Sequence, residues 1–307
     1  MTDNEGSITT EVKDHIFLIG LNRPEKLNGY TPTMATQLVD AMTELDTNDE
    51  FWVGFYSLMV TISQLVLTCQ NGQTECLQMT DSYRSEFPLD PMALGRACRK
   101  PIITAVKGIT YTFGIELALA GDIIIAADNC RFSQLEPARG IHATGGATFR
   151  FVERGGWGNA MYHLLTCDEF DAEEAYRIGL VQEIVPAGSE LTRALDFAAR
   201  ICEMAPLAVQ ETKASSKRWI DEGFKATVNA MGSVQSKLLA SDDAKEGVAS
   251  LLNEDQLNLK ADKSPIWNHI FLATPNRPNQ LAAEFCAGWH LFSCLPLERR
   301  SEHGSGF

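Results

Sequence analysis

The sequence lacks paired cysteines, an unbroken apolar run and an excess of basic charge. Its eight cysteines are dispersed without any Cys-x-x-Cys spacing, which predicts neither a zinc knuckle nor a disulfide framework and favours a reducing, cytoplasmic location. The apolar stretch 51–69 is interrupted by Gly54, Ser57 and Gln64, so it is too broken to span a bilayer. The polar, acidic start MTDNEGSITTEVKD excludes a secretory signal.

The charge balance is acidic, with 26 basic against 40 acidic residues and a net charge of −14. A field of this sign repels nucleic acid and anionic membrane, so neither is an expected partner. A polyanionic ligand would need local lysine, arginine and backbone amide groups. The 307 residues, 45% of them apolar, suit one large globular domain or a core with a smaller appendage.

The start of the chain has a strand pattern followed by a helix pattern. Strand character runs from 9 to 21 and stops before Pro24. Thr31 and Pro32 predict a helix start, with threonine as N-cap and proline in the first helical position. Apolar residues then follow at helical spacing and predict one buried face, formed by Met34, Leu38, Met42 and Leu45.

A compact strand–helix–strand pattern lies in the middle of the chain. The stretch 101–106 (PIITAV) predicts a buried strand that ends at Gly108. Phe113 opens a short helix of small residues, and 122–127 (DIIIAA) predicts the next buried strand. Short crossovers of this kind are typical of parallel pairing, so we expect an α/β core.

The later chain is mostly helical. Helical patterns cover 157–165 and 172–178, a strand at 180–185 stops at Pro186, and 191–248 is helical in character. We therefore expect a core at 1–190, a helical C-terminal region at 191–250 that packs on the core or on a sister subunit, and a tail at 251–307 outside the fold.

Two glutamates, Glu116 and Glu136, each follow a buried strand. Gly114, at the start of the short helix, lets backbone N–H groups approach a ligand oxygen, and the helix dipole stabilises negative charge there. Two carboxyl groups placed in this way can converge as a general acid and a general base. From the residues alone, the alternative that both are solvated surface side chains stays open.

Several motifs, in order, resemble the enoyl-CoA hydratase/isomerase (crotonase) family. The stretch 105–151 (AVKGITYTFGIELALAGDIIIAADNCRFSQLEPARGIHATGGATFRF) is similar to that family's central signature. The family's first strand and turn are similar to GLNRPEKLN. Its late segment is similar to LLTCDEFDAEEAYRIGLVQEIVP, and its last helix to SDDAKEGV. The resemblance covers about 8–53 and 88–250. It implies a crotonase-like spiral of ββα units with a helical C-terminal region, assembled as a homotrimer or hexamer.

The resemblance also implies roles for single residues. Glu116 and Glu136 would be the catalytic pair that adds water across the 2,3 double bond of an acyl-CoA thioester. One N–H of the oxyanion hole would come from Phe113, beside Gly114, where the family has a run of three glycines. The implied substrate-binding residues are Arg23, Lys26 and Leu27 near coenzyme A, and the glycine pair Gly145 and Gly146. No metal or separate cofactor is implied, since coenzyme A is part of the substrate.

The resemblance fails at two places. Between 53 and 80 there is no alanine–glycine loop to supply the second oxyanion N–H. Codons that encode 54–72 can be chosen so that the shifted reading frame, which begins at the third base of each codon, translates as VLFAHGDHFTAGLDLPKW. This string resembles the missing loop. Codons for 250–262 permit FLERRPAKFKGR and then a stop, which resembles the family's C-terminus. We therefore hypothesise that about 54–79 and 251–307 are frameshifted.

Three functions remain open at this stage. Two glutamates favour hydration, double-bond isomerisation is the alternative within the family, and a catalytically impaired relic follows if the first oxyanion loop is missing. Other features favour structural roles. These are His142 and His163 as satisfied histidines, 155–159 (GGWGN) as a packed turn, and the acidic run 168–174 as a solvated helix start rather than a metal site.

Overall fold

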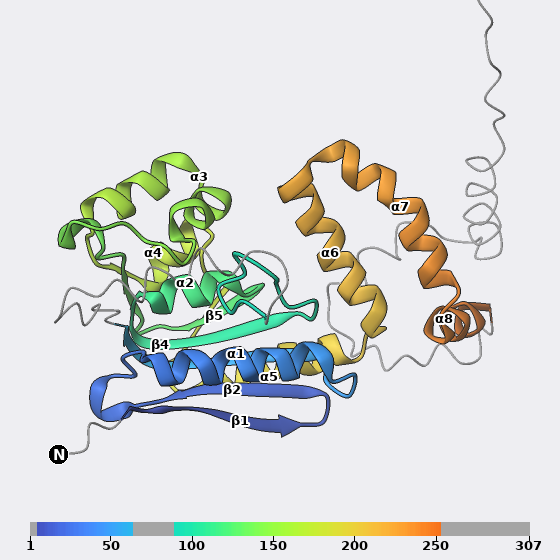
Figure 1. Ribbon diagram of the computed structural model, residues 1–307, viewed down its shortest axis with the longest axis horizontal. Helices are drawn as coiled ribbons and strands as arrows, with labels where there is room; N and C mark the ends of the chain where they lie inside the picture. Colours follow the sequence, from blue (N-terminus) through green and yellow to red (C-terminus); the bar gives the residue numbers. More distant parts are fainter. Residues whose placement is uncertain (1–4, 64–88, 253–307) are drawn as a thin grey trace, which may run out of the picture. The chain divides into compact units, whose positions relative to one another are not determined.

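A computed structural model describes residues 5–63 and 89–252 of the chain, which divides into two compact units, 1–245 and 246–307 (Figure 1). The described residues of the second unit are only the end of helix α8 (Asp242–Leu252). In the part of the chain that is described, no helix combines the length and the apolar character needed to cross a membrane.

The predicted strand at 9–21 is in fact a hairpin of two strands. β1 (Ser7–Lys13) and β2 (Ile16–Asn22) pair antiparallel around a turn at Asp14 and His15. Asp14 has a left-handed φ of 51°, a conformation that aspartate tolerates better than most residues. The turn therefore divides a stretch that favours strand on both sides of it, and the prediction of one strand is wrong.

The hairpin continues into a mixed sheet of eight strands, ordered β1-β2-β3-β4-β5-β8. The strands after the hairpin are β3 (Val53–Ser63), β4 (Ile102–Thr112), β5 (Ile123–Ala127) and β8 (Glu183–Val185). From β2 onward these neighbours are parallel. β6 (Arg131–Ser133) extends β4 in parallel, and β7 (Phe170–Asp171) pairs antiparallel with β6. The predicted α/β core is confirmed.

β4 does not end at Gly108, as the sequence suggested. Gly108 has a positive φ of 66°, and the pairing of β3 with β4 shifts register between Met59 and Thr61, opposite this point. The irregularity is absorbed within the sheet, and β4 continues to Thr112. The longer strand carries the chain directly to the start of the next helix.

Helices cover both faces of the sheet (Figure 1). One face packs against α1 (Pro32–Thr47), α2 (Phe113–Ala120), α3 (Ala147–Thr166) and α4 (Ala172–Arg177). The other face packs against α5 (Glu190–Cys202). Alternating residues of β2 separate the layers, with Phe17 and Ile19 in the first core and Ile16 and Leu18 in the second. α6 (Pro206–Glu222) and α7 (Phe224–Leu239) follow.

Helix α1 confirms the sequence prediction in detail. Thr31 is its N-cap, with the side-chain oxygen accepting a hydrogen bond of 3.2 Å from the Met34 N–H, and Pro32 is in its first turn. The four predicted apolar positions are all buried. They place the helix on the sheet through a continuous apolar face.

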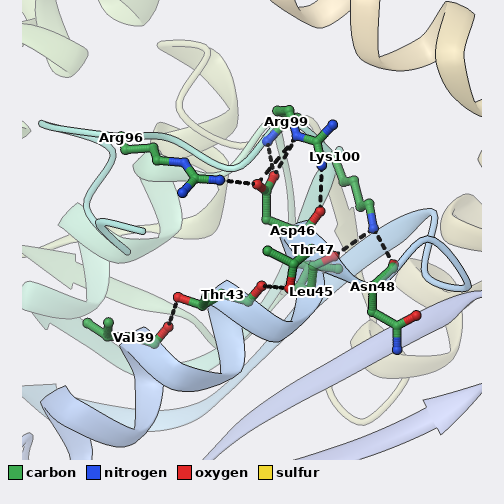
Figure 2. Close-up of polar contacts among 9 residues, drawn as sticks. All are labelled: Val39, Thr43, Leu45, Asp46, Thr47, Asn48, Arg96, Arg99 and Lys100. Carbon is green, nitrogen blue, oxygen red and sulfur yellow. Dashed lines mark hydrogen bonds and ion pairs between the residues drawn. The ribbon is translucent and has the colours of Figure 1, made fainter. Parts of the chain in front are cut away.

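An ionic cluster around the buried side chains of Asp46 and Lys100 fixes the other end of α1 (Figure 2). The Lys100 ammonium group donates to the carbonyls of Leu45 (2.7 Å) and Asn48 (2.6 Å), so a positive charge meets the negative end of the helix dipole. Asp46 accepts from Arg96 Nη2 (2.9 Å) and from the Arg99 N–H (2.8 Å). Burial raises the pKa of Asp46, but hydrogen bonds and charge from Arg99 outweigh it and lower the pKa. The cluster joins α1 to the segment before β4.

Candidate active site

The candidate site is built where β4 passes into α2. Thr112, the last residue of β4, has φ 49° and ψ −115°, a conformation that is strained for a residue with a Cβ. This is the first position of the tripeptide that stands in place of a three-glycine run. Phe113 begins the helix, and its ring stacks on Tyr30 with centroids 4.0 Å apart. The first N–H groups of a helix have no intrahelical acceptor, which makes the Phe113 amide suitable as an oxyanion donor.

Glu116 points from α2 to the start of α3. Its side chain is only 5% exposed. Oε1 accepts hydrogen bonds from the Gly145 N–H (2.7 Å) and the Ala147 N–H (3.1 Å). The carboxyl group is therefore fixed in position by backbone amides from another element, and the alternative that Glu116 is a solvated surface residue is wrong.

The predicted glycine pair lies against this carboxyl group. A Cβ at Gly145 would stand 2.6 Å from Glu116 Oε2 and 2.8 Å from Cδ, so a larger residue would overlap the carboxyl group. Gly146 has φ 108°, and a Cβ there would overlap the Arg150 guanidinium. Both glycines thus allow the backbone at 145–147 to approach Glu116.

Burial raises the pKa of Glu116 to about 7. This value includes a smaller rise from the charge of Glu136 and the lowering effects of the Ala147 and Gly145 amides and of Arg150. Burial also raises the pKa of Glu136, which is the N-cap of the short 3-10 helix η2 (Pro137–Arg139). The two glutamates therefore interact, and they do not both ionise readily below neutral pH.

Gln134 is a residue of this region that the sequence reasoning missed. It is 1% exposed, and its side chain lies beside the Glu136 carboxyl group, whose pKa it lowers against the effect of burial. Gln134 therefore helps to set the protonation state of the candidate pair. No pattern in a single sequence distinguishes such a glutamine from any other polar residue.

Arg150 is a second residue that the sequence did not indicate. It lies in the first turns of α3, is 7% exposed, and its Nη1 donates to the Gly145 carbonyl at 2.9 Å. Its Nη2 donates to the Met92 carbonyl at 2.5 Å. Its charge is therefore buried beside the amide that holds Glu116.

The profile of the enoyl-CoA hydratase/isomerase family matches residues 11–261. The chain belongs to this family. A probable enoyl-CoA hydratase of Mycobacterium bovis is 30% identical over 250 residues, which cover 81% of this chain and 95% of the relative. The crotonyl-CoA hydratase of Syntrophomonas wolfei is 30% identical over 264 residues, which cover 82% of this chain and 97% of the relative.

Solved structures agree with the family assignment. The crystal structure of a probable enoyl-CoA hydratase/isomerase from Mycobacterium abscessus is 38% identical and superposes with a TM-score of 0.74, covering 80% of this chain and 95% of that one. An enoyl-CoA hydratase from Mycobacterium tuberculosis is 28% identical, with a TM-score of 0.68 over 80% of this chain and 96% of that one. The chain therefore has the expected crotonase-like α/β fold and is a member of an enzyme family.

The residues predicted to lie near coenzyme A form a tight turn. η1 (Pro24–Lys26) is followed by Leu27, which is left-handed with φ 52° and 42% exposed. Arg23 Nη1 donates to the Gly29 carbonyl at 3.1 Å, so this guanidinium also holds the turn. Binding of coenzyme A by Arg23, Lys26 and Leu27 stays a prediction.

The two histidines, the GGWGN stretch and the acidic run each contact neighbouring parts of the fold. His163 is 3% exposed and its Nε2 lies 3.1 Å from Glu174 Oε1, but its buried Nδ1 has no hydrogen-bond partner among the described residues, so the predicted satisfied histidine holds for one ring nitrogen only. His142 Nδ1 lies 3.0 Å from the Ala143 carbonyl. The GGWGN stretch lies within α3, at a kink where Gly156 has φ 74°. In the acidic run, Asp171 is the N-cap of α4 and accepts from the Glu174 N–H.

The two segments of the frameshift hypothesis are described only in small part. Residues 53–63 form β3, whose pairing with β4 ends at Ser63 opposite Thr112. The strand position in the sheet is therefore filled, and it ends beside the start of α2. Residues 64–79, and 253–307 of the tail, lie outside the described residues.

Proposed function

We propose that the protein hydrates the 2,3 double bond of an acyl-CoA thioester, with Glu116 and Glu136 as the acid–base pair. The observation that carries this proposal is the paired burial of the two carboxyl groups. Glu116 is held by two backbone amides, its pKa is raised to about 7, and the charge of Glu136 contributes to that rise. A carboxyl group with a pKa near 7 can hold a proton while its neighbour is ionised, which is the state that hydration needs.

The reaction follows from this state. A water between the carboxyl groups adds through its oxygen to C3 of the enoyl thioester, and its proton passes to the ionised carboxylate. The electron pair of the double bond moves toward the thioester oxygen, where the Phe113 N–H at the start of α2 stabilises the enolate. The protonated carboxyl group then gives its proton to C2. The product is a 3-hydroxyacyl thioester, and the pair keeps one proton.

Hydration of crotonyl-CoA by purified variants tests the proposal. Glu116→Gln and Glu136→Gln should each lower kcat by roughly 10²- to 10⁴-fold, because each removes a group that transfers a proton in the transition state. Glu173→Gln, on the exposed side of α4, is the matched control and should leave kcat unchanged. Wild-type rates in both glutamine variants of the pair would show that it is not the catalytic pair.

Two alternatives have their own readouts. An isomerase would move the double bond without changing the mass of the acyl-CoA, whereas a hydratase adds the mass of one water, so mass spectrometry of the product separates them. The impaired relic is favoured by one observation, the absence of an alanine–glycine loop between 53 and 80. It predicts that Glu116→Gln changes nothing, because the rate would already be at background.

Binding and assembly complete the proposal. Lys26 and Arg23 in the first turn would contact the phosphates of coenzyme A, and no separate cofactor is needed. A homotrimer or hexamer, a cytoplasmic location and a role in fatty acid metabolism remain proposals from the family resemblance. Lys26→Met should raise KM for crotonyl-CoA with little effect on kcat, because a phosphate contact far from the reacting atoms binds substrate and transition state alike.

A further inference from the structure

Arg150 is a buried cation that donates hydrogen bonds to backbone carbonyls. Its guanidinium joins Gly145 (2.9 Å) to Met92 (2.5 Å) and, more weakly, to Ala93 (3.4 Å). A buried charge is costly unless it is hydrogen-bonded. The planar guanidinium can satisfy carbonyls on opposite sides at once, whereas an ammonium group cannot do so with the same geometry.

One end of this bridge reaches the candidate catalytic carboxyl group. The residue whose carbonyl accepts from Arg150, Gly145, donates its N–H to Glu116 Oε1. Ala147, whose N–H is the second donor to Glu116, lies in the same turn of α3 as Arg150. Displacing the guanidinium would therefore move both amides that hold Glu116.

The other end of the bridge rests on a loop with its own internal order. The Asp90 carboxylate accepts from the N–H groups of Met92 (2.9 Å), Leu94 (2.8 Å) and Gly95 (2.9 Å). These bonds turn the carbonyls of Met92 and Ala93 toward Arg150. We name residues 90–96 the Asp90 loop.

The Asp90 loop is in turn attached to helix α1. Arg96, its last residue, donates to the fully buried carboxylate of Asp46 at 2.9 Å, and Arg99 binds the same carboxylate (Figure 2). A continuous set of hydrogen bonds thus runs from the end of α1 through the Asp90 loop and Arg150 to Glu116. Its members come from parts of the chain that are distant in sequence.

We propose that Arg150 is a positioning residue for the Glu116–Glu136 pair, held in place by the Asp90 loop. It fixes the backbone donors of Glu116 and supplies a positive charge that favours the ionised form of the pair. This inference rests on the proposed hydratase function for its kinetic consequence. Its structural consequence, the state of the Glu116 carboxyl group, is independent of any activity.

Arg150→Met and Arg150→Lys test the inference, with Arg154→Met as the matched control. Arg154 lies one turn further along α3 and also binds carbonyls, those of Leu119 (3.1 Å) and Gly121 (2.7 Å), away from Gly145. The measurement is the titration of Glu116 by NMR in full-length protein labelled with [13C]glutamate and assigned with Glu116→Gln. Arg150→Met should raise the midpoint above the wild-type value of about 7, because a nearby positive charge is lost. Arg154→Met should not.

Kinetics provide the second readout. Arg150→Met should lower kcat for crotonyl-CoA about 100-fold with KM nearly constant, and should move the pH optimum upward, because the pair is misplaced and more readily protonated. Arg150→Lys keeps the charge, so it should lower kcat with a smaller pH shift. It also serves if the methionine variant does not fold by circular dichroism.

The outcomes separate the two proposals. If Arg150→Met and Arg154→Met share the same Glu116 midpoint and the same kcat, Arg150 only supports stability and the inference is wrong. If hydration by the wild-type chain is indifferent to Glu116→Gln, the proposed function fails. In that case the titration alone still confirms or overturns the positioning of Glu116 by Arg150.

Discussion

Gly145 lies so close to the Glu116 carboxyl group that no other residue fits there. In Gly145→Ala the new methyl group would stand 2.6 Å from Oε2, so either the carboxyl group or the start of α3 must move. A displacement of about 1 Å at a reacting group can cost on the order of 100-fold in rate. We expect a loss of that size in kcat for crotonyl-CoA, together with a lower melting temperature.

Gly158→Ala is the control for that substitution. Gly158 lies in the same helix, and a Cβ there meets nothing within 4 Å, so alanine should keep kcat and slightly stabilise the helix. Equal kcat in the two alanine variants would show that the contact between Gly145 and Glu116 has no bearing on catalysis.

The raised pKa of Glu116 has a consequence for stability. The folded pKa is about 7 against an ordinary value of 4.5, so the folded protein keeps a proton that the unfolded chain loses. Stability is therefore highest below the unfolded pKa and falls as pH rises from about 4.5 to 7, by up to about 3 kcal/mol. Urea unfolding of wild type and Glu116→Gln across this range measures it.

The difference between the two unfolding curves is the informative quantity. The glutamine variant cannot ionise at this position, so its free energy of unfolding should rise relative to wild type as pH increases toward 7. A difference that stays constant between pH 4.5 and 7.5 would show that the Glu116 pKa is not raised in the folded protein.

At the scale of elements, helix α1 depends on a charge buried at its end. Lys100 is 2% exposed and donates to the carbonyls of Leu45 and Asn48. Lys100→Met removes charge-assisted hydrogen bonds and leaves these carbonyls unsatisfied, so we expect a loss of about 2 kcal/mol in the free energy of unfolding. Chemical denaturation measures this loss. Lys225→Met, at an exposed position of α7, should leave the curve unchanged, and similar losses in both variants would contradict the role of Lys100.

How far the elements could be predicted depended on the range of the interactions that decide them. α1 was predicted from its N-cap, its proline and its apolar spacing, all of which are local. The hairpin turn at Asp14 was missed because a single left-handed residue interrupts a run that favours strand on both sides. β4 was predicted too short because the irregularity at Gly108 is an extra residue within β4, and the pairing with β3 resumes beyond it at Thr110.

The same distinction applies to the candidate site. Glu116 and the glycine pair could be named because they lie in contiguous motifs, and the close approach of Gly145 to Glu116 gives the physical reason for that glycine. Arg150 and the Asp90 loop could not be named, since Arg150 binds carbonyls 57 and 58 positions away along the chain. Hydrogen bonds to distant carbonyls leave no pattern in one sequence.

At the scale of the whole molecule, the open matter is the segment after β3. The pairing of β3 with β4 ends at Ser63 opposite Thr112, one residue before the Phe113 amide. β3 thus ends beside the start of α2, where the Phe113 N–H is the proposed oxyanion donor. The written sequence has no alanine–glycine loop between 53 and 80. The other reading frame permits one, in the string VLFAHGDHFTAGLDLPKW.

Restoring the frame is therefore a test of the molecule as a unit. A chain with that string in place of 54–72, and ending after FLERRPAKFKGR, should hydrate crotonyl-CoA on the order of 10²- to 10³-fold faster than the written chain, because a second N–H stabilises the enolate. Glu116→Gln in the restored chain should abolish the gain. Sequencing the gene across both segments is the direct check. Codons incompatible with the two strings would overturn the frameshift hypothesis, and equal rates in the written and restored chains would show that the restored segment adds no oxyanion donor.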